Sequence, residues 1–271
     1  MLYNAKNGKV KFPDGVMEYI RFGTGERQLV LLPGLGDSLR SMGGLAIPMA
    51  LMYRTFAKDF TVHVFGRKYP APEGAGTREM ARDVKRAMDT LKVGRADLVG
   101  VSMGGMIAQF IAADFPEKVN KLVLTVTCPC PNPTLEAAVG EWEDLARKGD
   151  HTAFMESNLR LIYSADYYRK NAWTLPLVGT LTKPKSYQSF LVCARACRTH
   201  DAFGELSKIR ASTLVIGGRQ DRCLGGEASE EIARQISGAR LIMYEQWGHG
   251  LYEEAKDFNR LVLDYLREEI Q

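Results

Sequence analysis

Ser102 stands between glycines in the segment GVSMGG (100–105), where a strand-like run meets a helix-like one. A turn this sharp would lift the serine hydroxyl clear of a sheet. It needs Gly100 and Gly104, because side chains at these positions would collide with neighbouring backbone. The following helix would aim backbone N–H groups at any negative charge formed there. The pattern predicts a nucleophilic serine, and the alternative is a glycine-rich turn that allows close packing.

A serine nucleophile needs a general base, because its hydroxyl is weakly nucleophilic at its ordinary pKa. The chain has four histidines. His63 lies within a strand-like segment, where a packing role is expected, and His151 and His200 fall in helix-like segments. His249 follows another strand-like segment and has a glycine on each side, so its loop could turn the imidazole inward. We predict that His249 is the base.

The base in turn needs an orienting acid, and Asp221 is the candidate. It follows the strand-like segment at 213–218, so it would lie at the same edge of a parallel sheet as Ser102. No carboxylate comes directly after the strand-like segment at 121–127, where a competing acid could stand. The alternative role for Asp221 is to cap a turn or helix.

The segment LLPGLGDS (31–38) is the candidate oxyanion loop. Gly34 and Gly36 would allow its backbone N–H groups to face the serine. We predict that the N–H groups of Leu35 and Met103 hold the oxyanion, and loss of one such donor typically costs about 10²–10³ in kcat.

These residues require a sheet that brings several strand ends together. After an opening hairpin around the turn Pro13–Gly15, strand-like and helix-like segments alternate, which predicts an α/β fold with a mostly parallel, twisted sheet and helices on both faces. Strands are expected at 29–32, 61–65, 97–101, 121–127, 213–218 and 239–244. A helical stretch is expected after the strand at 29–32, with a break at Pro48 and an end near Lys58. Further helices are expected after an N-cap at Thr77 and at 106–115, 227–236 and 258–266.

The alternation lapses between residues 129 and 207, which are rich in helix-like segments. Because the chain then returns to finish the same sheet, we predict a core of residues 1–128 and 208–271 with an inserted helical cap at 129–207. Aromatic residues supply the cap with apolar surface: Trp142, Phe154, Tyr163, Tyr167, Tyr168, Trp173 and Phe190.

Composition excludes several classes of protein. The chain has 271 residues, 45% hydrophobic and 25% charged, and its net charge of +4 includes no basic cluster, so we expect no nucleic-acid partner. The first twelve residues lack a signal-peptide core, and the longest apolar stretch, at 43–53, is too short to span a membrane. Five cysteines form no CxxC pair or zinc spacing, so we expect reduced thiols and no metal. We also expect no cofactor and a cytoplasmic location. A homodimer is left open.

The four segments together resemble the α/β-hydrolase superfamily along nearly the whole chain. PGLGDS matches the oxyanion loop, GVSMGG the nucleophile elbow, GGRQD the acid turn and WGH the histidine loop. The order Ser102, Asp221, His249 is also that of the superfamily. The resemblance implies the α/β-hydrolase fold with a catalytic triad. Within the superfamily, the chain resembles the small capped group that includes enol-lactonases, haloperoxidase-like esterases and ring-cleavage hydrolases.

Three segments depart from this pattern. Pro33-Gly34 replaces the His-Gly that many relatives have, FGRKYPAPEG replaces an Asp-x-Arg-Gly turn, and no proline follows Asp221. The second departure suggests that the loop at 66–76 shapes the pocket differently.

Serine at the elbow disfavours haloalkane dehalogenases and epoxide hydrolases, which place aspartate there, and leaves acyl chemistry. We expect a serine esterase that acts on small apolar or aromatic carboxylic esters, thioesters or lactones. The alternatives are a C–C bond hydrolase of ring-cleavage products and a non-catalytic small-ligand binder. Arg195 and Arg198 could anchor a substrate carboxylate, although a solvated cap surface is the simpler interpretation.

Overall fold

The inner strands of the sheet are apolar on both faces, so both faces are buried. In the computed structural model, which describes residues 2–269, Leu29 and Leu31 point into one core cluster, while Val30 and Leu32 point into the other. This alternation is what a strand's two-residue period gives when helices cover both sides.

The sheet has eight strands in the order β1-β2-β4-β3-β5-β6-β7-β8. β2 pairs antiparallel with β1 and with β4, and the remaining neighbours are parallel. The strands are β1 (Lys6–Phe12), β2 (Gly15–Phe22), β3 (Arg27–Leu32), β4 (Phe60–Tyr69), β5 (Ala96–Val101), β6 (Val119–Thr125), β7 (Ser212–Gly218) and β8 (Arg240–Tyr244).

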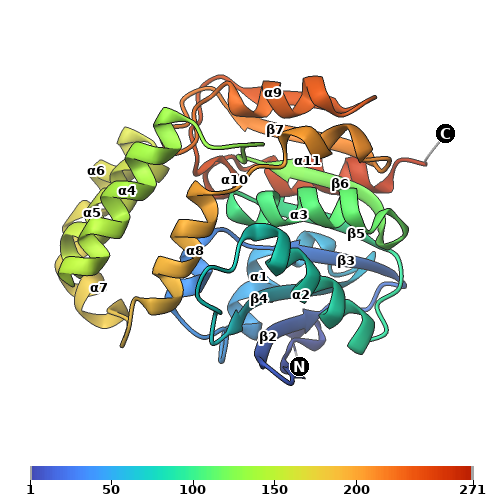
Figure 1. The fold of residues 1–271 in the computed structure, drawn as a ribbon, viewed down its shortest axis with the longest axis horizontal. Helices are drawn as coiled ribbons and strands as arrows, with labels where there is room; N and C mark the ends of the chain where they lie inside the picture. The colour runs from blue at the N-terminus through green and yellow to red at the C-terminus, as the bar shows by residue number, and fades with distance from the viewer. Residues whose placement is uncertain (1, 270–271) are drawn as a thin grey trace.

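Helices cover the two faces in two groups (Figure 1). Buried residues of α2 (Thr77–Thr90), α3 (Met103–Asp114) and α9 (Ala228–Gln235) belong to one core cluster. Those of α1 (Ala46–Met52), α10 (Leu251–Glu254) and α11 (Phe258–Arg267) belong to the other. The predicted α/β-hydrolase architecture is confirmed.

Five helices lie between β6 and β7 in the sequence. Figure 1 shows α4 to α7 gathered on one side of the sheet, with α8 between them and the rest of the molecule. They are α4 (Pro133–Lys148), α5 (His151–Ile162), α6 (Ala165–Asn171), α7 (Leu175–Thr182) and α8 (Gln188–Arg198). Within residues 2–269, no helix combines the length and apolarity that crossing a membrane requires. The outer ends of the predicted core, residue 1 and residues 270–271, lie outside the described part.

Two predicted helix boundaries are wrong. Pro48 does not break a helix: it is the third residue of α1, where its missing N–H would have no partner in any case, and α1 ends well before Lys58. Thr77 is not an N-cap. Gly76 occupies that position, its N–H donates to the Glu79 carboxylate (3.1 Å), and Thr77 is the first helical residue.

Three further elements exceed the prediction. β4 continues beyond residue 65, because it pairs with β2 as far as Val16 and Tyr69. α6 and α7 occupy part of the insertion where no periodic pattern had been recognised.

Candidate active site

Ser102 connects β5 directly to α3 in a strained conformation. Its backbone angles are φ 54° and ψ −122°, a combination that costs about 1–3 kcal/mol for a residue with a side chain. Surrounding hydrogen bonds hold it there: the Ser102 N–H donates to the Thr125 carbonyl (2.9 Å), and the Ser102 carbonyl accepts from Gly105 (2.8 Å) and Met106 (3.2 Å). Ser102 therefore stands at the carboxyl edge of the sheet.

The glycines around Ser102 are required by close packing. A Cβ on Gly104 would lie 1.9 Å from the Leu32 carbonyl oxygen, and one on Gly100 would lie 2.6 Å from the Gly104 oxygen. A Cβ on Gly34 would lie 3.3 Å from that of Ser102. Gly36 differs, since a side chain there would meet open space, so packing does not explain glycine at that position.

Three side chains from three strand ends form one hydrogen-bonded chain. His249 Nε2 lies 3.0 Å from Ser102 Oγ, and His249 Nδ1 lies 2.8 Å from Asp221 Oδ2. The other carboxylate oxygen of Asp221 accepts from the N–H groups of Cys223 (2.8 Å) and Leu224 (2.9 Å). Asp221 thus also caps its own turn, the alternative role that the sequence left open. With the Nδ1 proton facing Asp221, Nε2 is free to accept the Ser102 proton.

Two helical segments begin near Ser102, and each has a backbone N–H group at its first residue. Leu35 is the first residue of the 3₁₀ segment η2 (Leu35–Leu39), and Met103 is the first residue of α3. The first N–H groups of a helix have no partner within it. The predicted oxyanion donors therefore come from positions where backbone hydrogen bonding leaves them available.

The loops that carry Asp221 and His249 pack on each other. Gln220 N–H donates to the Trp247 carbonyl (3.1 Å), and a Cβ on Gly248 would lie 2.8 Å from the Gln220 oxygen. These contacts fix the separation of the two loops and so of the Asp221 and His249 side chains.

The junction between α5 and α6 is tied to the same two loops, which the sequence did not reveal. Arg222, next to Asp221, donates to the Tyr163 carbonyl (2.7 Å). The N–H of Gly250, next to His249, donates to the Ile162 carbonyl (2.7 Å). The inserted helices therefore help to hold the acid and base loops in place.

Two carboxylates of α10 strengthen this junction. Glu254 accepts from the N–H (3.0 Å) and hydroxyl (2.6 Å) of Ser164, and Glu253 accepts from the Tyr163 hydroxyl (2.8 Å). Burial raises the pKa of Glu253. No local sequence pattern signals these contacts, because about 90 residues separate the partners.

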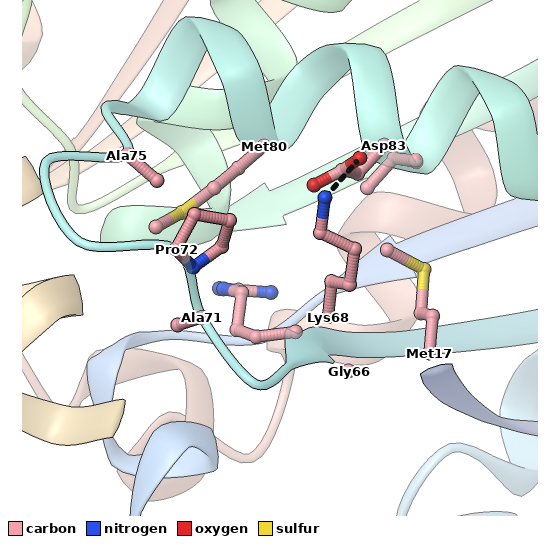
Figure 2. Close-up of a pocket in the computed structure, with 10 residues that line it drawn as sticks. Met17, Gly66, Lys68, Ala71, Pro72, Ala75, Met80 and Asp83 are labelled. Carbon is pink, nitrogen blue, oxygen red and sulfur yellow. Dashed lines mark hydrogen bonds and ion pairs between the residues drawn. The ribbon is translucent and has the colours of Figure 1, made fainter. Parts of the chain in front are cut away.

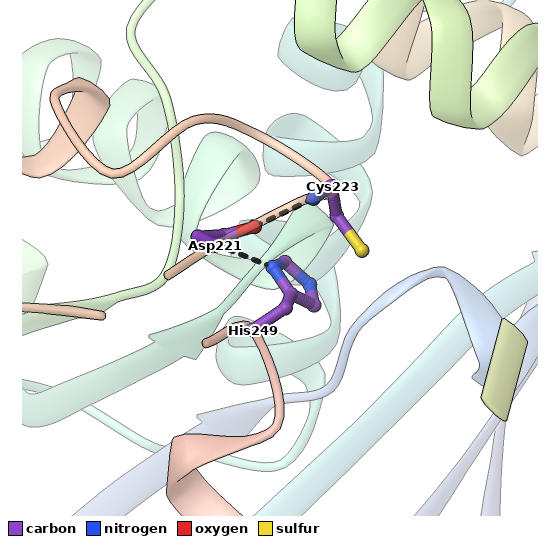
Figure 3. A group of neighbouring side chains, drawn as sticks. All are labelled: Asp221, Cys223 and His249. Carbon is purple, nitrogen blue, oxygen red and sulfur yellow. Dashed lines mark hydrogen bonds and ion pairs between the residues drawn. The ribbon is translucent and has the colours of Figure 1, made fainter. Parts of the chain in front are cut away.

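Asp221, Cys223 and His249 are the one group of potential metal ligands found within residues 2–269 (Figure 3). Their ligand atoms lie within 4.8 Å of one another, and all three residues are buried. Zinc accepts such donors, but burial raises the pKa of the Cys223 thiol, and Asp221 and His249 are hydrogen-bonded to each other. This chemistry fits catalysis better than metal binding. All five cysteines are free thiols, as predicted.

Comparisons with known proteins identify the family. Residues 28–156 match the family model described as alpha/beta hydrolase fold, and residues 182–269 match the model described as TAP-like protein. The chain belongs to the α/β-hydrolase superfamily. It is an enzyme of the hydrolase class, so the alternative of a non-catalytic binder is set aside.

Proteins similar to this α/β-hydrolase are named for different activities. It is 28% identical to the 2-hydroxy-6-oxo-6-phenylhexa-2,4-dienoate hydrolase of Comamonas testosteroni, over 97% of this chain and 96% of the relative. It is 27% identical to the putative carbamate hydrolase RutD of Pseudomonas savastanoi pv. phaseolicola, over 88% and 93%. The enol-lactonase of Burkholderia xenovorans LB400 has the same fold, with a TM-score of 0.80, 22% identity and coverage of 96% and 100%.

The other three histidines of the hydrolase lie elsewhere. His63 in β4 contacts Gln28 (3.0 Å), His151 contacts the Tyr187 hydroxyl (2.6 Å), and His200 contacts the Thr77 hydroxyl (2.8 Å). Burial lowers the pKa of His63 to about 4 and that of His200 to about 3. Both are therefore neutral in the folded protein at neutral pH.

These two histidines predict acid-sensitive stability. An unfolded histidine titrates near pH 6.5, so between that pH and its folded pKa the unfolded state binds one more proton. The free energy of unfolding should then fall by about 1.4 kcal/mol per pH unit for each histidine as pH decreases. Urea denaturation of the parent and of His200→Gln between pH 7 and pH 5 measures this. The free energy of unfolding of His200→Gln should depend less steeply on pH than that of the parent. An equal slope in the two proteins would contradict the prediction.

Arg195 and Arg198 line a groove whose lining does not include Ser102. Arg195 is exposed, and Arg198 forms ion pairs with Glu136 (2.7 Å) and Glu143 (3.1 Å). Both arginines line a groove with these two glutamates. The apolar stripe of α8, which includes Cys193 and Cys197, is buried instead. The simpler interpretation of a solvated surface is therefore the one that the structure favours.

Proposed function

We propose that this α/β-hydrolase cleaves small carboxylic esters, thioesters or lactones through an acyl-enzyme. The hydrogen-bonded chain from Asp221 through His249 to Ser102 is the observation that supports the proposal. It has the order of contacts that nucleophilic acyl transfer requires: nucleophile, base and orienting acid.

In the first half-reaction, Ser102 Oγ bonds to the substrate carbonyl carbon while its proton passes to His249 Nε2. The carbonyl oxygen becomes an oxyanion, which the N–H groups of Leu35 and Met103 stabilise. The Asp221 carboxylate stabilises the resulting imidazolium. The bond to the leaving group then breaks as Nε2 returns the proton to the leaving oxygen or sulfur.

In the second half-reaction, water attacks the acyl-enzyme. His249 takes a proton from the water, the hydroxide oxygen bonds to the acyl carbon, and the ester bond to Ser102 breaks. The carboxylic acid leaves and Ser102 regains its proton. None of these steps requires a cofactor or a metal ion.

Residues 129–207 act as a cap over this site, and residues 1–128 and 208–271 act as the core. α8 packs against η2, which overlaps the second half of the proposed oxyanion loop. Aromatic side chains fill the interior of the insertion: Phe154 and Phe190 meet edge to face with centroids 5.0 Å apart. An apolar roof of this kind favours small apolar or aromatic acyl groups.

Hydrolysis of a C–C bond in a ring-cleavage product is the second candidate, because a 2-hydroxy-6-oxo-6-phenylhexa-2,4-dienoate hydrolase matches nearly the whole chain. That relative acts on a dienoate, which carries a carboxylate. The two arginines of α8 that could have bound a carboxylate line a groove with glutamates instead. This arrangement favours the ester and lactone proposal.

A substrate panel tests the choice. Purified protein is assayed with p-nitrophenyl esters of increasing acyl length, a γ-lactone and a 2-hydroxy-6-oxodienoate. We expect turnover of short esters with a burst of nitrophenol equal to the enzyme concentration, and an acyl adduct in the intact mass. Turnover of the dienoate with kcat/KM more than a hundredfold above every ester would overturn the proposal.

A further inference from the structure

Arg67 contacts the peptide that leads into the proposed oxyanion loop. It lies in the segment FGRKYPAPEG, which departs from the family pattern. Its Nη2 donates to the Pro33 carbonyl oxygen at 2.5 Å. Pro33 is followed by Gly34 and then by Leu35, the proposed oxyanion donor.

The Pro33 carbonyl is close to the nucleophile as well. A Cβ on Gly104 would lie 2.7 Å from the Pro33 oxygen, and one on Gly34 would lie 3.3 Å from Ser102 Cβ. The guanidinium of Arg67 therefore contacts the segment that lies next to Ser102.

Two further hydrogen bonds of this segment are local. Asp37 N–H donates to the Gly34 carbonyl (3.3 Å), and the Ser38 hydroxyl donates to the Leu35 carbonyl (2.6 Å). Both close turns within the loop and do not fix its position in the molecule. The bond from Arg67 joins the start of the loop to β4 and so to the sheet.

The pairing of Arg67 is unlike that of its neighbour. Lys68 forms ion pairs with Asp83 (3.1 Å) and Asp14 (2.6 Å), and Figure 2 shows the Lys68 ammonium directed at Asp83 of α2. Arg67 has no such ion pair within residues 2–269, and its Nε and Nη1 are buried without a protein partner. Arg67 as a whole is half-buried, and buried N–H donors without a partner cost stability, which is typical of functional positions.

One carboxylate lies near Arg67. Burial raises the pKa of Asp37 to about 6, and the charge of Arg67 is the largest effect that opposes this rise. The Asp37 Oδ2 atom is buried without a partner, and a Cβ on Gly66 would lie 3.3 Å from it. When Asp37 is ionised, its negative charge is therefore close enough to offset part of the positive charge of Arg67.

We propose that Arg67 is a positioning residue for the oxyanion hole. It orients the Pro33–Gly34 peptide, and so the N–H of Leu35, through its hydrogen bond to the Pro33 carbonyl. The charge of its half-buried guanidinium, which is bonded to this loop, also favours the negative oxygen that forms when Ser102 attacks a carbonyl. This inference rests on the proposed acyl-transfer function.

The experiment compares Arg67→Met, Arg67→Lys and the control Arg82→Met, whose arginine pairs only with Glu79 on the surface of α2 within the described residues. For each protein, kcat and KM are measured with p-nitrophenyl butyrate, after active sites are counted with a fluorophosphonate. The inhibition constant of an alkyl boronic acid, which forms a tetrahedral adduct with an active serine, is measured as well.

We expect Arg67→Met to lower kcat per active site by about 10- to 100-fold, with KM changed by less than about threefold. The inhibition constant of the boronic acid should rise by a similar factor, because the tetrahedral adduct loses the same stabilisation. Arg67→Lys should recover part of the loss, because it keeps the charge and one donor, and Arg82→Met should match the parent.

Three results separate the explanations. If Arg67→Met lowers only the melting temperature and keeps kcat per active site and boronic acid affinity, the residue is structural and the inference fails. If Arg67→Met does not fold, Arg67→Lys decides by the same two measurements. If the parent neither reacts with the fluorophosphonate nor hydrolyses the ester, the proposed function fails instead.

Discussion

Ser102→Ala should abolish turnover and leave the fold intact. Removal of a serine nucleophile lowers kcat by a factor on the order of 10⁴–10⁶, because the remaining groups can only bind and polarise the substrate. Alanine has the same backbone restrictions as serine, so the hydrogen bonds of Ser102 N–H and C=O to Thr125, Gly105 and Met106 should persist. The melting temperature should therefore change little.

Covalent labelling measures the same property without a substrate. A fluorophosphonate should add one adduct to the parent and none to Ser102→Ala, as read by intact mass. Ser186→Ala, which removes an exposed serine, should label like the parent. An adduct on Ser102→Ala, or unchanged ester turnover by it, would place the nucleophile elsewhere. No adduct on a folded parent would mean that the serine is not activated.

The strands and the residues at their carboxyl ends could be predicted from sequence, because their signals are local. Apolar runs of four to seven residues indicate buried strands, and glycines next to Ser102 and His249 indicate sharp turns. Once the strands are parallel, their carboxyl ends must share one edge. This rule brings Ser102, Asp221 and His249 together from positions up to 147 residues apart.

Contacts between distant segments could not be predicted in this way. Thr77 had the composition of an N-cap, but its hydroxyl pairs with His200, 123 residues later, and Gly76 takes the capping position. Likewise, the bonds from Arg222 to Tyr163 and from Arg67 to Pro33 depend on how whole elements pack. A single sequence contains no periodic signal for such pairs, although the unusual segment around Arg67 marked a place where the chain departs from its family.

Asp221→Asn should separate the two roles that one carboxylate has here. The amide oxygen can still accept from the N–H groups of Cys223 and Leu224, so the turn and the stability should be preserved. The amide NH₂ would then face His249 Nδ1 and donate to it. This forces the proton onto Nε2, which can no longer accept from Ser102, and kcat should fall by about 10⁴.

Asp221→Ala supplies the contrast. It removes the partner of the imidazole and also leaves two backbone N–H groups without an acceptor, at a cost of about 1–3 kcal/mol for each buried donor. Both variants should be nearly inactive, but only the alanine variant should lose stability in urea denaturation. If Asp221→Asn kept kcat within tenfold of the parent, the carboxylate would serve as a turn cap alone. The acid of the triad would then have to be sought at another strand end.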